Sequence, residues 1–174
     1  MSNSHRMTCH YFSDAWIKLN TLPVCFGAKD NKFGKFSVPS GGSLLAIKLV
    51  HVHGYVTRAK NQVYHLSYWG CGAHSSLSDQ VDVVITTSTN SVLLPPSQFM
   101  GQSLPKQYKW SKIPGYNSLS PELVLSVFSS PLTLTVTSGQ VLRLWYGEDL
   151  VNSSESDNGG TSCCDVFLAS CKLA

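Results

Sequence analysis

Carboxylates gather near the C-terminus in one short stretch, residues 147–158 (GEDLVNSSESDN), which lies between two strand-like runs. Clustered carboxylates repel each other unless a cation joins them, and Ca²⁺ accepts about six to eight oxygen ligands from flexible loops of this composition. The stretch lacks the D-x-[DN]-x-[DN]-G spacing of an EF-hand. If the flanking strands pair, the ends of the loop meet and its side chains converge on a calcium site. The alternative is a solvated turn in which residues 157–160 set the backbone geometry. The candidate ligands are Glu148, Asp149, Glu155, Asp157, Asn158 and Asp165.

A second candidate site lies in the long polar and aromatic segment 97–120. Pro105 and Pro114 exclude a long regular element there, and long loops in compact domains are commonly functional or packed onto the surface. Aromatic rings with polar neighbours bind sugars by stacking. We therefore predict a ligand-contact surface, and the alternative is that the rings pin the loop onto the domain. The candidate residues are Trp110, Tyr116 and Tyr108.

The histidines and serines offer little catalytic chemistry. His51 and His53 lie two apart in a strand-like run, so we expect them to share a face, where they can hold a metal with His65 or His74. Satisfied, partly buried imidazoles are the commoner outcome. No G-x-S-x-G elbow occurs, and no catalytic residue is predicted. The sequence therefore favours a protein that is not an enzyme.

Six cysteines, an even number without a CxxC pair, indicate a disulfide framework. Reduced buried thiols are the main alternative. Successive side chains of a strand point to opposite faces, so Cys163 and Cys164 should have different partners. Cys164 shares its phase with Val166 and Leu168 and is predicted to face inward. The disulfide candidates are Cys9, Cys25, Cys71, Cys163, Cys164 and Cys171.

Composition favours an extracellular β-domain. Charged residues make up 13% of the 174-residue chain, against the roughly 25% typical of soluble domains. The net charge of +3 comes from scattered basic residues, so no nucleic-acid partner is expected. No apolar run reaches the about eighteen residues of a membrane span. One domain over residues 8–174 suffices. Residues 1–7 lack the apolar core of a signal peptide, so we interpret them as a flexible N-terminus or a remnant outside the domain.

Short apolar runs bounded by glycine, proline and small polar residues predict an all-β fold. The strongest run is 44–53, which Gly54 should end; residues 55–57 and 63–69 should continue as further strand. Residues 8–22 should form a first strand or a short amphipathic segment. The other predicted strands lie within 33–38, 81–86, 92–94, 123–127, 132–137, 141–146 and 163–168. Nine to ten short strands without a convincing helix predict a single antiparallel β-sandwich, jelly-roll-like or Ig-like, that contains disulfides.

The C-terminal segment carries a resemblance. The run LRLWYGEDL, followed by ESDNGG and CxDVF within residues 141–171, resembles the closing segment of uncharacterised extracellular β-modules of corals and sea anemones. The doubled Cys163–Cys164 departs from the single cysteine of that ending. The resemblance implies a secreted or matrix-associated module and brings no established activity.

Together these features predict a non-enzymatic extracellular binding module. A lectin-like function is the leading hypothesis, with glycans or extracellular glycoproteins as partners, Ca²⁺ as the candidate cofactor and a homo-oligomer compatible with the sequence. One alternative is a structural, oligomeric matrix protein without a small ligand. A secreted hydrolase is the other, and it requires a cleft that joins a histidine to a carboxylate or hydroxyl.

Overall fold

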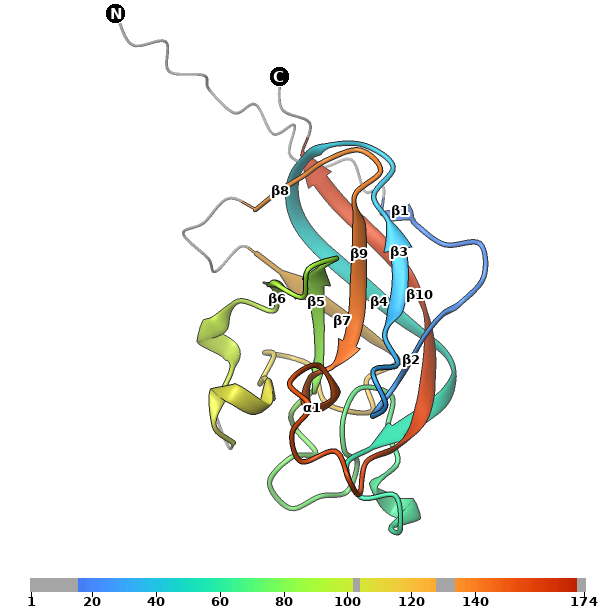
Figure 1. Cartoon of the computed structure of the whole chain (residues 1–174), viewed down its shortest axis with the longest axis vertical. Coiled ribbons are helices and arrows are strands. Elements are labelled where there is room, and N and C mark those ends of the chain that lie inside the picture. Colours follow the sequence, from blue (N-terminus) through green and yellow to red (C-terminus); the bar gives the residue numbers. More distant parts are fainter. Residues whose placement is uncertain (1–15, 102–103, 128–133, 172–174) are drawn as a thin grey trace, which may run out of the picture.

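The computed structural model describes residues 16–101, 104–127 and 134–171, which form two antiparallel sheets packed face to face (Figure 1). The six-stranded sheet has the order β1-β10-β4-β7, with β2 paired to β10 and β8 paired to β4; the four-stranded sheet has the order β3-β9-β5-β6. The predicted sandwich of nine to ten strands is confirmed. The strands are β1 (Ile17–Lys18), β2 (Val24–Gly27), β3 (Gly34–Ser37), β4 (Gly42–Thr57), β5 (Val83–Thr87), β6 (Val92–Leu94), β7 (Glu122–Ser126), β8 (Leu134–Val136), β9 (Val141–Tyr146) and β10 (Gly159–Cys171), and the helical turns are η1 (Val63–His65), η2 (Ser97–Phe99), η3 (Lys106–Tyr108) and α1 (Gly147–Leu150).

The core lies between the sheets, where every second side chain of the long strands points inward. Leu49 of β4, Val166 of β10 and Leu144 of β9 are fully buried there, as the period of two predicts. Trp69, which follows η1, closes one end of the core. No helix among the described residues is long and apolar enough to cross a membrane.

Strand β4 does not end at Gly54 as predicted, but continues to Thr57 along β10. The strand bends instead of breaking. Val52 is an extra residue at a shift of register between the two strands, and Gly54 has φ +81°, a conformation that glycine adopts at little cost. The bulge and the glycine turn the last residues of β4 toward the loops at this end of the sandwich.

The strand predicted over 63–69 is wrong. Residues 63–65 form the 3-10 turn η1, and Ser67 makes only an isolated bridge with Val56. Local hydrogen bonds explain the difference, because the Leu66 N–H donates to the carbonyl of Val63 at 3.2 Å. Of the strand expected within 8–22, the described residues include β1; residues 8–15 lie outside them.

Candidate functional site

The acidic loop 147–158 connects the two sheets rather than two paired strands. β9 pairs with β3 and β5, whereas β10 pairs with β1, β2 and β4. The expectation that the flanking strands pair is therefore wrong, because consecutive strands here belong to opposite layers. The loop crosses one end of the sandwich, and the first residues of its helical turn α1 are buried there (Figure 1).

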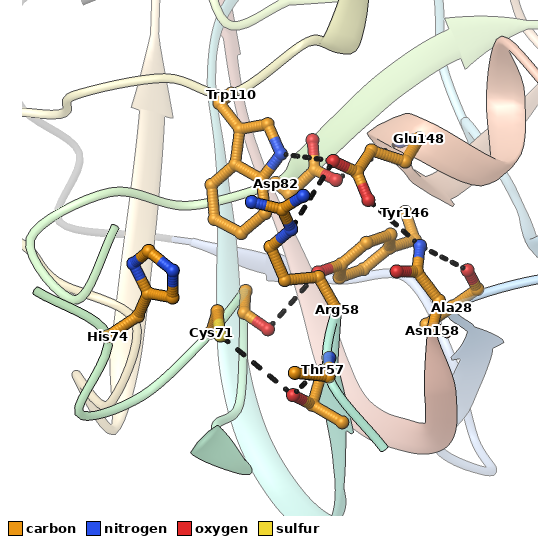
Figure 2. Close-up of polar contacts among 12 residues, drawn as sticks. Ala28, Thr57, Arg58, Cys71, His74, Asp82, Trp110, Tyr146, Glu148 and Asn158 are labelled. Atoms are coloured by element: carbon orange, nitrogen blue, oxygen red, sulfur yellow. Dashed lines mark hydrogen bonds and ion pairs between the residues drawn. The ribbon is translucent and has the colours of Figure 1, made fainter. Parts of the chain in front are cut away.

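Glu148 lies fully buried at the centre of a polar network (Figure 2). Its Oε1 accepts a hydrogen bond from Trp110 Nε1 at 3.0 Å, and its Oε2 accepts one from Asn158 Nδ2 at 3.0 Å. The Arg58 Nε lies 3.8 Å from Oε1. Asn158 Nδ2 also donates to the carbonyl of Ala28 at 3.1 Å. These contacts join the two ends of the acidic loop to both sheets.

Asp82, one residue before β5, is the second buried carboxyl of this network. Its backbone carbonyl accepts the Gly147 N–H at 2.7 Å, and its Oδ2 accepts the Glu148 N–H at 3.1 Å. Its Oδ1 has no hydrogen-bond partner among the described residues. An aspartate inside an otherwise apolar strand run was the only sequence signal of this role.

Burial raises the pKa of both carboxyl groups, because a charge is poorly solvated inside the protein. The charge of Glu148 raises the pKa of Asp82 further, whereas Arg58 opposes both shifts. The hydrogen bonds from Trp110 and Asn158 stabilise the charged form of Glu148 and limit the rise of its pKa. Ionising these buried carboxyl groups therefore lowers the stability of the folded protein.

Raising the pH should lower the free energy of unfolding through Asp82. A carboxyl with a raised folded-state pKa binds its proton more tightly when folded, so its contribution is complete below the unfolded-state pKa and is lost as the pH rises toward the folded-state pKa. The loss should begin above pH 3.8, the ordinary pKa of Asp82, with a slope of at most about 1.4 kcal/mol per pH unit for one proton. Urea unfolding at a series of pH values measures this slope.

Asp82→Asn is the matched variant, since an amide oxygen still accepts the Glu148 N–H but the side chain does not ionise. We expect a flatter dependence of unfolding free energy on pH than in the unmodified protein. Asp149, with a pKa raised to about 6, contributes in the same direction to both proteins and cancels in the comparison. Equal slopes in the two proteins would contradict the assignment.

Asp149 binds the β2–β3 turn rather than pointing to solvent. Its Oδ1 and Oδ2 accept the backbone N–H groups of Asn31 and Lys32 at 2.8 and 2.9 Å. Burial raises its pKa to about 6, and a hydrogen bond with Glu155 contributes to the rise. Glu155 also accepts the Asp30 N–H at 3.3 Å.

The other two acidic candidates lie apart from this pair. The Asp157 side chain is exposed, and its carbonyl accepts the Lys60 N–H at 2.8 Å. Asp165, on the outer face of β10, pairs with Lys18 at 2.7 Å and with Asn20 at 2.8 Å. The hydrogen bond from Lys18 lowers the pKa of Asp165. The predicted convergence of six ligands is thus wrong. Glu148 and Asp149 are bonded to buried partners within the protein, and Asp165 lies apart from the loop on β10.

Trp110 is fully buried, so its ring offers no face to a ligand at the surface. This corrects its assignment as a contact residue. Met100 packs against Val84 and Trp145 on one side of the four-stranded sheet, and Trp110 belongs to the main core. Tyr108 and Tyr116 are half-buried and pack against the main core. For Trp110, the structure favours the alternative that aromatic rings pin the loop.

The cysteines divide into bonded and free. Cys25 and Cys163 face each other on β2 and β10 and form a disulfide, while Cys164 points into the core, so the predicted opposite orientation of Cys163 and Cys164 is confirmed. Cys71 and Cys164 are free buried thiols, which corrects their assignment as disulfide candidates. Cys171 is not a free thiol, and Cys9 lies outside the described residues.

The histidine pair does not share a face as expected. Cys163 pairs with His53 and Cys164 with His51 across the bulge at Val52, so the extra residue places the two rings on opposite sides of the sheet. His53 lies beside the sulfurs of the Cys25–Cys163 disulfide, which are not available as metal ligands. His51 instead stacks on Tyr68 with ring centroids 3.8 Å apart.

A shallow groove of about 570 Å³ opens between β2 and β3. The segment 19–23 and the edge residues of both strands line it, including Phe33 and Lys35. Its main amide, Asn20, is already bonded to Asp165, Val166 and the Leu22 carbonyl. The groove therefore offers volume but few free polar groups.

The fold and these contacts define a disulfide-containing, two-sheet antiparallel β-module whose loop end is fastened by buried carboxylates. No model of a protein family matches the chain, and no curated protein matches it. Among solved structures, AJLec from the sea anemone Anthopleura japonica is similar over 88% of this chain and 96% of its own, with 38% sequence identity and a TM-score of 0.77. The chain belongs to the same family as AJLec. AJLec is a sea anemone protein, which is consistent with the resemblance to sea anemone β-modules that the C-terminal segment indicated.

Proposed function

We propose that this protein is a non-enzymatic extracellular module that binds carbohydrate. The observation that carries the proposal is its membership of the AJLec family, because the name AJLec marks that protein as a lectin. The Cys25–Cys163 disulfide supports an extracellular location, since such bonds persist in oxidising compartments.

The buried carboxyl groups support a binding module over a hydrolase. Glu148 and Asp82 are fully buried and bonded to Trp110, Asn158 and the backbone of α1, so they fasten the loop rather than face a substrate. A hydrolase would need such a carboxyl or a histidine beside an open cleft. The network acts instead as an internal clamp.

An array of printed neutral and acidic glycans tests the proposal. We expect the protein to bind a limited set of glycans, and the free sugar of the strongest spot to compete for that binding. Heat-denatured protein is the control for adsorption. If no glycan on the array is bound, with or without Ca²⁺, the alternative of a structural, oligomeric protein is favoured. Sedimentation at several protein concentrations would then test for oligomers.

Calcium binding is a separate part of the proposal. The charge of Glu155 contributes to the raised pKa of the buried Asp149, and a cation bound between the two carboxyl groups would relieve the repulsion between them. Glu155 accepts the Asp30 N–H, and Asp149 accepts the N–H groups of Asn31 and Lys32, so both carboxyl groups lie at the β2–β3 turn. The pair therefore forms the part of the predicted ligand set that this loop still brings together.

Saturating Ca²⁺ should raise the melting temperature by about 5–10 °C relative to chelator, because a ligand at a hundred times its Kd that binds only the folded state adds about 2.7 kcal/mol. Differential scanning calorimetry measures the shift. Glu155→Gln should abolish most of it, while Asp157→Asn, at an exposed position of the same loop, should leave it. An unchanged melting temperature in the unmodified protein would end the calcium proposal.

A further inference from the structure

Three aromatic side chains form one surface at the end of β4, which we name the aromatic platform: His51, Tyr55 and Tyr68. The His51 ring stacks on Tyr68 with centroids 3.8 Å apart and an angle of 18° between the planes. Tyr55 lies 6.0 Å from His51 and 5.6 Å from Tyr68, tilted against both. His51 and Tyr55 belong to β4, and Tyr68 follows the turn η1. The sequence pattern predicted a strand over 63–69 and gave no sign that these rings meet.

The backbone holds the platform rigidly. The bulge at Val52 and the left-handed Gly54 place His51 and Tyr55 side by side. The His51 Nε2 lies 2.7 Å from the Gly54 carbonyl and donates a hydrogen bond to it. Val56 and Ser67 exchange two backbone hydrogen bonds of 2.8 and 2.9 Å. A surface fixed in this way loses little conformational entropy when a ligand binds.

The platform has an apolar face and a polar edge. Tyr55 is 47% exposed, and Trp69 lies buried beneath, edge-on to His51 at 6.2 Å. Neither tyrosine hydroxyl, of Tyr55 or Tyr68, has a hydrogen-bond partner within the part of the chain that the structure describes. His51 and Tyr68 are half-buried, and Tyr68 also packs against the main core. The exposed Tyr55 ring therefore offers the main face for C–H contacts, and the two tyrosine hydroxyls can form hydrogen bonds with a ligand.

The groove between β2 and β3 is a weaker candidate for the same role. Of its two aromatic rings, Phe36 is buried. The face of Phe33 is occupied by Arg143 at 4.4 Å and Lys35 at 5.3 Å, and Trp145 packs against the ring at 4.5 Å. Its amide, Asn20, is bonded within the protein. A sugar in the groove would have to displace these contacts, whereas on the platform it can stack on the exposed ring of Tyr55.

We infer that the aromatic platform is the surface on which this module stacks a sugar ring, so the inference rests on the proposed carbohydrate binding. The ligand is a pyranose with a continuous apolar C–H face, at the exposed end of a glycan. An open surface of this kind cannot enclose a small apolar ligand, but it suits a sugar, which binds by stacking on one ring and keeps its other hydroxyl groups in water.

Isothermal titration with the strongest glycan from the array, as a free oligosaccharide, tests the inference. Tyr55→Ala and Tyr68→Ala should each weaken binding about fivefold to tenfold, the effect of one lost ring contact. Tyr55→Phe keeps the ring and should retain most of the affinity. Tyr64→Ala is the matched control, because Tyr64 is 62% exposed but packs against His65 instead, and it should bind like the unmodified protein.

The outcomes separate this inference from the proposed function. If the protein binds glycans and both alanine variants bind as tightly as Tyr64→Ala, the platform is not the site, while carbohydrate binding stands. If the array is silent, both fall. If Tyr55→Ala instead abolishes a concentration-dependent dimer seen in sedimentation and leaves glycan affinity intact, the platform is an interface between copies and the inference is overturned. Melting curves of each variant exclude misfolding as the cause of lost binding.

Discussion

Replacing Trp110 with alanine should lower the free energy of unfolding by about 3–5 kcal/mol, the range for removing a large buried aromatic side chain. The ring is fully buried and lies edge-on to Tyr146, with centroids 6.2 Å apart. Its Nε1 is also one of two side-chain donors to the buried carboxylate of Glu148 (Figure 2). The substitution therefore creates a cavity and removes a partner from a buried charge. Equilibrium unfolding in urea measures the loss.

Two further variants divide the effect of Trp110 into packing and hydrogen bonding. Trp110→Phe keeps most of the ring and removes the N–H donor, so it should cost about 1–3 kcal/mol. Tyr108→Ala, at a half-buried position of the same segment, should cost less than Trp110→Ala. A loss below about 1 kcal/mol for Trp110→Ala would contradict the placement of this ring in the core.

Gly54→Ala should be nearly as damaging, with a loss of about 3–5 kcal/mol. Gly54 has φ +81°, and a Cβ at this position would lie 2.2 Å from the carbonyl oxygen of Thr161 on the neighbouring strand. The added carbon cannot be accommodated unless β4 and β10 separate. Because Gly54 also accepts the hydrogen bond of His51, the variant should disturb the aromatic platform as well.

Gly139→Ala is the matched control for backbone strain. Gly139 has φ +77°, almost the value of Gly54, but nothing lies within 4 Å of the position where its Cβ would stand. The cost should therefore be the strain of the left-handed conformation alone, about 1–2 kcal/mol. Urea unfolding of both variants isolates the clash with Thr161, and equal losses would show that the clash is absent.

Sequence periodicity alone determined the class of fold and the face of most strand residues. In the predicted strand 141–146, Leu142 and Leu144 lie two apart and so share a face, and both are fully buried. The same reasoning placed Cys164 inward and Cys163 outward of the core. This succeeds because the direction of a side chain from a strand depends on the local backbone, which repeats every two residues.

Tertiary structure alone decided which strands pair. The strands on either side of the acidic loop are β9 and β10, and their apolar patterns would suit one sheet or two equally well. Only the packing of distant segments places them in opposite layers, with β9 between β3 and β5. Strand pairing is a nonlocal property, because the partners lie far apart in the chain.

The roles of the carboxyl groups in the acidic loop also depend on partners that lie far away in the chain. The loop was expected to expose a set of carboxylates, but Glu148 is buried by Trp110 and Arg58, and Asp149 by the turn at Asn31. Carboxyl groups look alike in a sequence whether they face water, a cation or a buried partner. Their roles depend on groups that only the folded chain brings within hydrogen-bond distance.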